Sequence, residues 1–368
     1  MKLDPELIKY LTNDHFRVLT AIEQGMKNHE FVSMPLIESL ANLKRSNAFK
    51  VVQHLLKHKC VFHTGKNYSG YALTYMGYDY LALRVFMKRG HIKKVVCQIG
   101  VGKESDIYIC ESGDKKDENG ELVHKGQPVV IKFARLGRTS FRSIKNNRDY
   151  LKGRAAQSWL YMSRIASLKE YAFMKALHER DFPTPIPIDA NRHGIVMSLI
   201  KAYPMVNVKG LINTEKVYHR LIELIIQFAE HGLVHGDFNE FNLMINDDEE
   251  VTVIDFPQMV STSHPNAQFY FGRDVQCIQR FFTKRFRLAF EGVPVLESDV
   301  ERKLDLDTEI KASGCFNQEK NDAMEAYDRL NEEYLQSRQE GGGEAQEEGE
   351  SEEEKDDKEA DEAVVEDD

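Results

Sequence analysis

The chain of 368 residues contains no run of about 18 consecutive apolar residues, the length that a helix needs to cross a membrane. We therefore expect no membrane-spanning helix. The first residues lack the apolar stretch of a secretory signal peptide, so we expect no such signal. The five cysteines form no C-x-x-C pair, which argues against a zinc site and favours reduced thiols inside a cell.

The net charge of −10 is unevenly distributed. Residues 340–368 hold 16 acidic and 2 basic residues, so the rest of the chain carries a balance of +4. This composition predicts a disordered acidic tail over residues 336–368. Two roles for the tail remain open: solubility, and screening of a basic surface against indiscriminate nucleic-acid binding.

Residues 1–90 predict a winged-helix domain, in which three helices precede a two-stranded hairpin and a closing helix. The expected elements are helices over His15–Lys27, Pro35–Leu43 and Asn47–Lys59 (with Ser46 as N-cap), strands over Val61–His63 and Gly70–Leu73, and a helix over Thr74–Arg84. In winged-helix proteins the third helix enters a nucleic-acid groove, and here it carries Lys50. We favour nucleic-acid contact at Lys50, with protein docking and a purely structural role as alternatives.

A glycine-containing turn separates two apolar runs between residues 95 and 109. It reads Gly100-Val101-Gly102-Lys103-Glu104-Ser105, so a serine stands where a third glycine is usual. Glycine lets the backbone approach a phosphate that a side chain would block. We interpret the turn as a loop that covers nucleotide phosphates. Its spacing differs from G-x-x-x-x-G-K-[ST], which excludes a Walker P-loop here.

Lys132 lies inside the apolar run Pro128–Phe133, which predicts a buried strand. A buried charge needs a partner. In the protein-kinase layout such a lysine contacts the nucleotide phosphates and a glutamate on a helix. Glu170, in the helical pattern Leu168–Leu177, is the preferred partner, and Glu179 is the alternative.

Residues 135–154 contain seven basic residues and one acidic residue. The intervening Ser, Thr, Asn and Gly residues predict a mobile loop. We predict contacts from Arg138, Arg142 and Arg148 to RNA phosphates or to a substrate, with an ordinary solvated loop as the alternative.

The segment His235–Asn242 carries the groups that phosphoryl transfer needs. It follows an amphipathic run, and two short apolar runs after it predict a hairpin that ends at Asp255. Asp237 can hold an attacking hydroxyl, while Asn242 and Asp255 can hold magnesium on the phosphates. The spacing matches the H-R-D-x-x-x-x-N loop and the D-F-G aspartate of protein kinases.

The apolar run Gly194–Ile200 predicts a strand that leads into a loop. The backbone of Met197, Ser198 and Ile200 is suited to contact the edge of an adenine. Farther along the chain, helical patterns predict helices over Gln268–Phe290, Asp299–Ser313 and Gln318–Arg338.

Together these motifs resemble the Rio family of atypical serine/threonine kinases. The winged helix, the G-K-E-S-D loop and the proline after Asp255-Phe256 resemble its second branch. The resemblance covers residues 1 to about 330. It implies an α+β fold with an N-terminal winged helix followed by a trimmed bilobal kinase-like domain, in which no A-P-E motif follows Asp255. The implied parts are a winged helix (1–90), an N-lobe (91–200), a C-lobe (201–335) and the acidic tail.

The resemblance also implies ATP and Mg²⁺ as cofactors and a role for each site residue. Asp237 would be the catalytic base, Asn242 and Asp255 the metal ligands, and Lys132 the phosphate contact. The loop from Gly100 to Ser105 would cover the phosphates, and residues 197–200 would form the adenine hinge. Asp255 would also accept the phosphoryl group as an aspartyl-phosphate, with metal ligation alone as the alternative.

Three departures from ordinary kinases favour slow ATPase or autophosphorylation activity over turnover of protein substrates. They are Gly236 in place of the Arg of H-R-D, Asn239 in place of a common Lys, and Pro257 in place of the Gly of D-F-G.

For the cell, the resemblance implies a role in late maturation of the small (40S) ribosomal subunit and its rRNA. The expected partner is the precursor of that subunit, with its rRNA, ribosomal proteins and assembly factors. The expected location is the cytoplasm, with nuclear shuttling. The alternative function is an ATP-bound assembly placeholder whose catalysis is incidental. The oligomeric state stays open.

Overall fold

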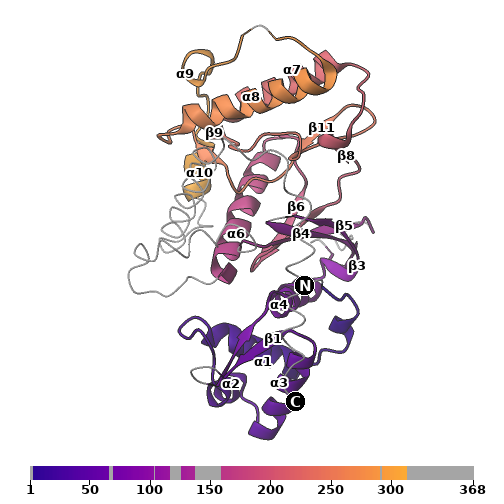
Figure 1. Cartoon of the computed structure of the whole chain (residues 1–368), viewed down its shortest axis with the longest axis vertical. Helices are drawn as coiled ribbons and strands as arrows, with labels where there is room; N and C mark the ends of the chain where they lie inside the picture. The colour runs from indigo at the N-terminus through magenta and orange to yellow at the C-terminus, as the bar shows by residue number, and fades with distance from the viewer. Residues whose placement is uncertain are drawn as a thin grey trace. The chain divides into compact units, whose positions relative to one another are not determined.

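The computed structural model describes residues 3–65, 69–102, 104–116, 126–136, 159–290 and 292–312 (Figure 1). All of them belong to one compact unit, Met1–Tyr327. The predicted acidic tail, Lys103, and the predicted contact residues Arg138, Arg142 and Arg148 lie outside the described residues. Within the described ranges, no helix is long and apolar enough to span a membrane.

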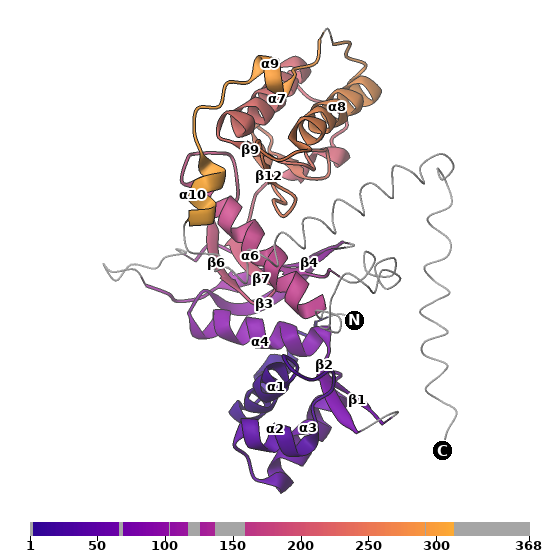
Figure 2. The same cartoon turned by 90° about the vertical axis from the view of Figure 1, so that its left-hand side faces the viewer.

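The winged-helix arrangement predicted for the N-terminal part is confirmed (Figure 2). A short 3-10 turn, η1 (Leu7–Lys9), precedes α1 (Asn13–Gly25), α2 (Met34–Ala41) and α3 (Arg45–Lys57), and β1 (Val61–Thr64) pairs with β2 (Gly70–Leu73) in an antiparallel hairpin. The ends of the three helices and of the first strand differ from the prediction by one or two residues. Thr12 and His15 form a capping box that starts α1 at Asn13, and α3 begins after Lys44 rather than after Ser46.

Helix α4 (Tyr75–Lys88) extends one turn beyond the predicted helix and is buried on nearly all sides. It begins at Thr74, whose side chain accepts a hydrogen bond from the Gly77 N–H at 3.2 Å. A helix buried all round must pack against neighbours on several faces. Accordingly, α4 contacts α1 and β2 of the winged helix as well as β3, β6 and β7 of the next domain.

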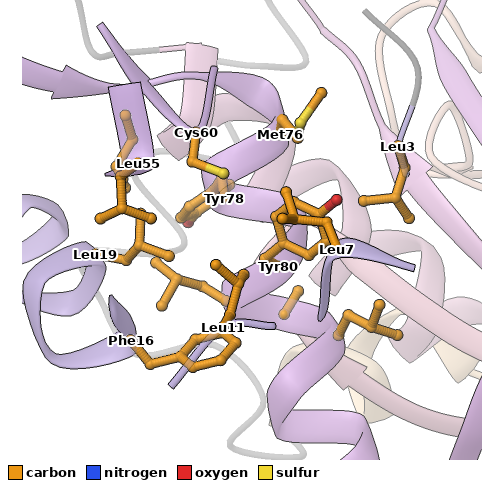
Figure 3. Close-up of a cluster of buried hydrophobic side chains, with 14 of the residues drawn as sticks. Leu3, Leu7, Leu11, Phe16, Leu19, Leu55, Cys60, Met76, Tyr78 and Tyr80 are labelled. Carbon is orange, nitrogen blue, oxygen red and sulfur yellow. The ribbon is translucent and has the colours of Figure 1, made fainter. Parts of the chain in front are cut away.

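One continuous hydrophobic core therefore runs through both parts. Leu7 and Leu11, from the N-terminal segment, belong to it together with Phe16 of α1 and Tyr80 of α4 (Figure 3). The Tyr80 hydroxyl also donates to the Asp4 carbonyl at 2.7 Å. Each fully buried side chain of this size contributes about 1.5–3 kcal/mol, so the N-terminal segment stabilises the unit as a whole.

A five-stranded antiparallel sheet of order β3-β4-β5-β7-β6 forms the N-lobe. Its strands are β3 (Ile92–Val101), β4 (Ser105–Ser112), β5 (Val129–Ala134), β6 (Pro187–Asn191) and β7 (Gly194–Ser198). Helix α6 (Trp159–His178) contacts β5, β6 and β7 and includes the helix predicted over Leu168–Leu177. This sheet and helix place Lys132 opposite Glu170.

The C-lobe is mainly helical, and its short strands carry the catalytic segments. Its elements are β8 (Tyr203–Pro204), η3 (Met205–Asn207), α7 (Thr214–Glu230), β9 (Leu233–Val234), β10 (Leu243–Ile245), β11 (Val251–Val253), β12 (Val260–Ser261) and α8 (Ala267–Phe286). The predicted hairpin is β10–β11, with Leu243 opposite Val253. The predicted catalytic loop, His235–Asn242, lies between β9 and β10, and Asp255 follows β11.

The prediction of one helix over Asp299–Ser313 is wrong. The structure has two short helices, α9 (Leu296–Asp299) and α10 (Leu306–Ala312), with no regular secondary structure between them. The backbone N–H groups of Lys303 and Leu304 donate to the Glu230 carbonyl at 2.7 and 3.1 Å. These bonds to the end of α7 take up two N–H groups that a continuous helix would need for its own hydrogen bonds.

Candidate active site

The predicted phosphate-covering loop is the tight turn between β3 and β4. The Gly102 N–H donates to the Ser105 carbonyl at 2.7 Å. A Cβ on Gly102 would lie 3.3 Å from that oxygen, so a larger residue would require a shift of a few tenths of an ångström in the turn. Val101 beside it is 70% exposed, and Gly100 pairs with Ile107 in the ladder. The turn thus presents backbone rather than bulky side chains to a ligand.

Lys132 of β5 is buried between two carboxylates. Its Nζ donates to Glu170 Oε1 and to Asp255 Oδ1, both at 2.7 Å. The expected Lys132–Glu170 ion pair is therefore present. The alternative partner, Glu179, lies beside Lys175 at 3.9 Å on the surface. One ammonium thus links the N-lobe sheet, helix α6 and the aspartate that follows β11.

These charges shift one another's protonation. Burial disfavours the Lys132 ammonium, but Asp255 and Glu170 outweigh that effect and raise its pKa. Burial raises the pKa of Glu170. Burial alone would raise the pKa of Asp255, but the charge and hydrogen bond of Lys132 outweigh burial, so the Asp255 pKa is lowered. Asp255 is therefore ionised at neutral pH, the form required of a metal ligand or a nucleophile.

Asp237 is held in place by two amides of its own loop. Asn239 Nδ2 donates to Asp237 Oδ1 and Asn242 Nδ2 to Asp237 Oδ2, both at 2.9 Å. Burial, and then the charge of Asp255, raise the Asp237 pKa. A raised pKa makes the carboxylate a better proton acceptor, as the predicted role of catalytic base requires.

Asp274 of α8 anchors the backbone of the catalytic loop, and sequence reasoning missed this role. Its carboxylate accepts from the Gly236 N–H at 2.8 Å and from the Phe238 N–H at 3.0 Å. Gly236 has φ +79°, and a Cβ there would lie 2.8 Å from the Gln258 carbonyl oxygen. The only signal in the sequence was an acidic residue among the buried positions of an amphipathic helix.

The oxygen atoms in the site fit a magnesium ion. Asn242 uses its Nδ2 to bind Asp237, which leaves its carbonyl oxygen as a ligand. Asp255 uses Oδ1 to bind Lys132, and its side chain is 39% exposed. Protein-bound Mg²⁺ usually takes one or two such oxygens and completes its shell with water and substrate phosphates. In keeping with this, the described part of the chain contains no group of three or more His, Cys, Asp or Glu residues arranged as a metal cage.

The predicted adenine hinge is the end of β7. Met197 is buried and pairs with Val130 of β5. Ser198 donates its N–H to the Ile186 carbonyl at 3.0 Å and accepts the Ile186 N–H on its Oγ at 2.9 Å. A contact from Ser198 to an adenine would therefore come from its carbonyl, with the Ile200 backbone following in the loop.

Two other predicted basic residues have different environments. Lys50 lies on the exposed side of α3, as surface contact requires. Arg135, which we had grouped with the basic loop, is 1% exposed and forms salt bridges with Asp79 and Asp106. The assignment of Arg135 to the basic loop is therefore wrong. A buried guanidinium that is paired with two carboxylates can contact neither a phosphate nor solvent.

A cavity of about 600 Å³ lies in the C-lobe, away from these residues. It is formed between α7 and the chain that follows α8, where the rings of Tyr218 and Phe290 stack with centroids 3.9 Å apart. None of the predicted nucleotide or metal contacts lines it.

A two-lobed fold with a Lys–Glu pair, a catalytic loop of Asp and Asn, and a third acidic residue after a hairpin defines a protein kinase. Two family models match the chain: the RIO domain over residues 106–292 and the Rio2 N-terminal domain over residues 8–89. The serine/threonine-protein kinase rio2 of Dictyostelium discoideum is 55% identical over 314 residues, which are 85% of this chain and 58% of that protein.

The serine/threonine-protein kinase rio2 of Schizosaccharomyces pombe is 46% identical over 331 residues, 89% of this chain and 92% of that protein. The chain is also similar to the crystal structure of the Rio2 kinase–ADP/Mg²⁺–phosphoaspartate complex from Chaetomium thermophilum. That similarity has a TM-score of 0.76 and 43% identity, and it covers 92% of this chain and 100% of the other. The chain belongs to the Rio2 family of serine/threonine-protein kinases.

Proposed function

We propose that this kinase uses Asp255 as the acceptor of the ATP γ-phosphoryl group, and that hydrolysis of the resulting aspartyl-phosphate completes a slow ATPase cycle. The observation that carries the proposal is the Lys132–Asp255 contact of 2.7 Å, with a lowered Asp255 pKa. It keeps the carboxylate ionised and fixes one of its oxygens. The phosphoaspartate complex of the Chaetomium relative supports the same chemistry.

In the proposed first step, the second oxygen of Asp255 attacks the γ-phosphorus. A new O–P bond forms, the bond from the γ-phosphorus to the β,γ-bridging oxygen breaks, and ADP leaves. In the second step water attacks the acyl phosphate, which restores the carboxylate and releases inorganic phosphate. Magnesium, when bound, supplies charge neutralisation on the phosphates. Asp237, with its raised pKa, would accept a proton from that water.

Chemical trapping tests the acyl phosphate. After incubation with ATP and Mg²⁺, treatment with hydroxylamine should convert phosphorylated Asp255 to a hydroxamate that mass spectrometry locates. The variant Asp237→Ala should still bind ATP but lose turnover, because Asp237 acts on the attacking group rather than on the bound nucleotide. Phosphate found only on Ser or Thr residues would reject the cycle and leave Asp255 as a metal ligand.

We further propose that the cycle operates on the precursor of the small (40S) ribosomal subunit during late maturation, in the cytoplasm with nuclear shuttling. The resemblance to the Rio family motivates this proposal, and the exposed Lys50 of α3 offers a contact for rRNA phosphates. Purified precursor particles should change the rate of ATP turnover. A rate that stays the same with bound precursor would instead favour an ATP-bound placeholder.

A further inference from the structure

A buried network of charged side chains surrounds Arg135, directly after β5. Its Nη1 and Nη2 donate to both oxygens of Asp79, each at 2.7 Å, and its Nε donates to Asp106 Oδ2 at 2.7 Å. Arg135, Asp79 and Asp106 are each 1% exposed. Such bidentate, charge-assisted bonds fix the positions of all three groups.

His193 completes the network. Its Nε2 lies 2.7 Å from Asp79 Oδ1 and 3.1 Å from Arg135 Nη1. Its ring stacks on the rings of Tyr78 and Phe133, with centroid separations of 4.6 and 5.1 Å. Stacking restrains the His193 ring, and its Nε2 in turn restrains the Asp79 carboxylate. The network is therefore a rigid link rather than a flexible contact.

One end of the link is the phosphate-covering loop. Asp106 is the first residue after the loop's Ser105, and the Arg135 N–H donates to the Glu104 carbonyl at 2.6 Å. Arg135 thus holds the C-terminal side of the loop through both its backbone and its side chain. The loop itself contributes few buried contacts, since Val101 and Gly102 are exposed. The Arg135 contacts therefore add to the β3–β4 and β4–β5 pairing in holding the loop.

The other end of the link is the winged-helix domain. Asp79 lies on α4, which packs against α1 and β2 as well as against the N-lobe sheet. Asp79 thus fixes the position of the guanidinium group through which Arg135 binds Asp106.

We propose that Asp79 of α4 is a positioning residue for ATP binding, which acts through Arg135 on the loop at residues 100–106. The winged helix therefore contributes to the nucleotide site without touching the nucleotide. By reciprocity, a ligand that shifts α4 changes the affinity for ATP, and ATP changes the affinity for that ligand by the same factor. The inference rests on the proposed binding of nucleotide beneath this loop.

The test compares the wild-type chain with Asp79→Asn, which keeps the shape of the side chain and removes its charge. Calorimetry with a non-hydrolysable ATP analogue and Mg²⁺ gives the dissociation constant, and hydrogen exchange reports on the amides of residues 99–107. We expect the dissociation constant to rise about 2- to 30-fold and the loop amides to exchange faster. Turnover at saturating ATP should stay close to wild type, so that KM changes and kcat does not.

The matched control is Glu23→Gln. Glu23 of α1 forms a bidentate pair with Arg192 of the β6–β7 turn, with both distances 2.7 Å. This pair also joins the winged helix to the N-lobe but does not reach the loop. The control should lower the melting temperature and leave both the dissociation constant and the loop exchange unchanged. An equal rise in the dissociation constant for both variants would reduce Asp79 to a structural role and overturn the inference.

A second variant, Asp106→Asn, breaks the link at its other end and should raise the dissociation constant in the same direction. It also decides the matter if Asp79→Asn fails to fold. In the double variant the effects should not add, because both act through Arg135. A folded variant with wild-type affinity and loop exchange overturns the inference. A wild-type chain that fails to bind the analogue refutes the proposed function instead.

Discussion

Acidification should destabilise this protein through His235, the first residue of the catalytic loop. His235 is 2% exposed, and its ring lies 5.5 Å from Phe238 and 5.7 Å from Phe256. Burial lowers its pKa to about 4, although the Asp255 carboxylate opposes the shift. In the unfolded chain the His235 pKa is near the ordinary histidine value of 6.5, so the unfolded chain binds more protons than the folded protein between pH 4 and pH 6.5. Stability therefore rises with pH across this window and is lost as the pH falls through it.

The two pKa values set the size of the effect. The full linkage amounts to about 3 kcal/mol, and about 2 kcal/mol of it is lost by pH 5. Other groups titrate in the same range, and Asp274, whose pKa burial raises to about 7, acts in the opposite direction. The contribution of His235 is thus best measured as a difference between two proteins that share those groups.

The assay is urea unfolding at pH 7.5 and pH 5 for the wild type and for His235→Phe, which fits an aromatic ring into the same surroundings. The variant loses the hydrogen bond from the Asp237 N–H at 3.3 Å, so it should be less stable at pH 7.5 by about 1 kcal/mol. Between the two pH values, however, it should lose about 2 kcal/mol less than the wild type. The same loss in both proteins, with matching m-values, would show that His235 is not held neutral by burial.

Two further predictions concern the catalytic machinery. Lys132→Met should abolish turnover, weaken nucleotide binding and reduce stability by about 3 kcal/mol, because it leaves two carboxylates without their cation. The control Lys175→Met, on the surface of α6, should have none of these effects. Unchanged nucleotide affinity and turnover in Lys132→Met would make Lys132 an ordinary buried lysine. Gly236→Ala should lower turnover at least about tenfold, because a left-handed backbone costs about 1–2 kcal/mol and the new methyl group meets the Gln258 carbonyl. Gly272→Ala, where nothing lies within 4 Å of the new Cβ, is the control, and equal turnover in both variants would contradict the argument.

Local patterns in the sequence were sufficient for most of the architecture. Helical periodicity predicted α8, and the amphipathic run before His235 coincides with α7. The lone lysine in an apolar run predicted both the strand β5 and the need for Glu170. The spacing of Asp237 and Asn242 matched the catalytic loop of protein kinases, and the structure places the two side chains within 2.9 Å of each other on that loop. These inferences relied on residues close in sequence, or on the Lys–Glu pair that is common to protein kinases.

What the sequence did not reveal depends on contacts between distant segments. The Arg135 side chain resembled its basic neighbours in sequence, and only its partner Asp79, 56 residues away, removes it from solvent. The role of Asp274 likewise appears only when α8 reaches the backbone of residues 236–238, nearly 40 positions earlier. The break between α9 and α10 follows from hydrogen bonds to Glu230 rather than from local propensity. No pattern of period 2 or 3.6 encodes such contacts.

Because α4 packs against both the winged helix and the N-lobe sheet, its burial is completed only late in synthesis of the chain. The helix ends at Lys88, but the strands that cover its other side extend to Ser198. At the usual pace of synthesis, the intervening 110 residues take roughly 5–20 s to appear. Until the end of that interval Phe86, which is fully buried in the finished protein, lacks the strands β6 and β7 on this side of α4. The nascent winged helix therefore exposes an apolar surface of α4 during this interval, and this surface can bind a chaperone or cause aggregation.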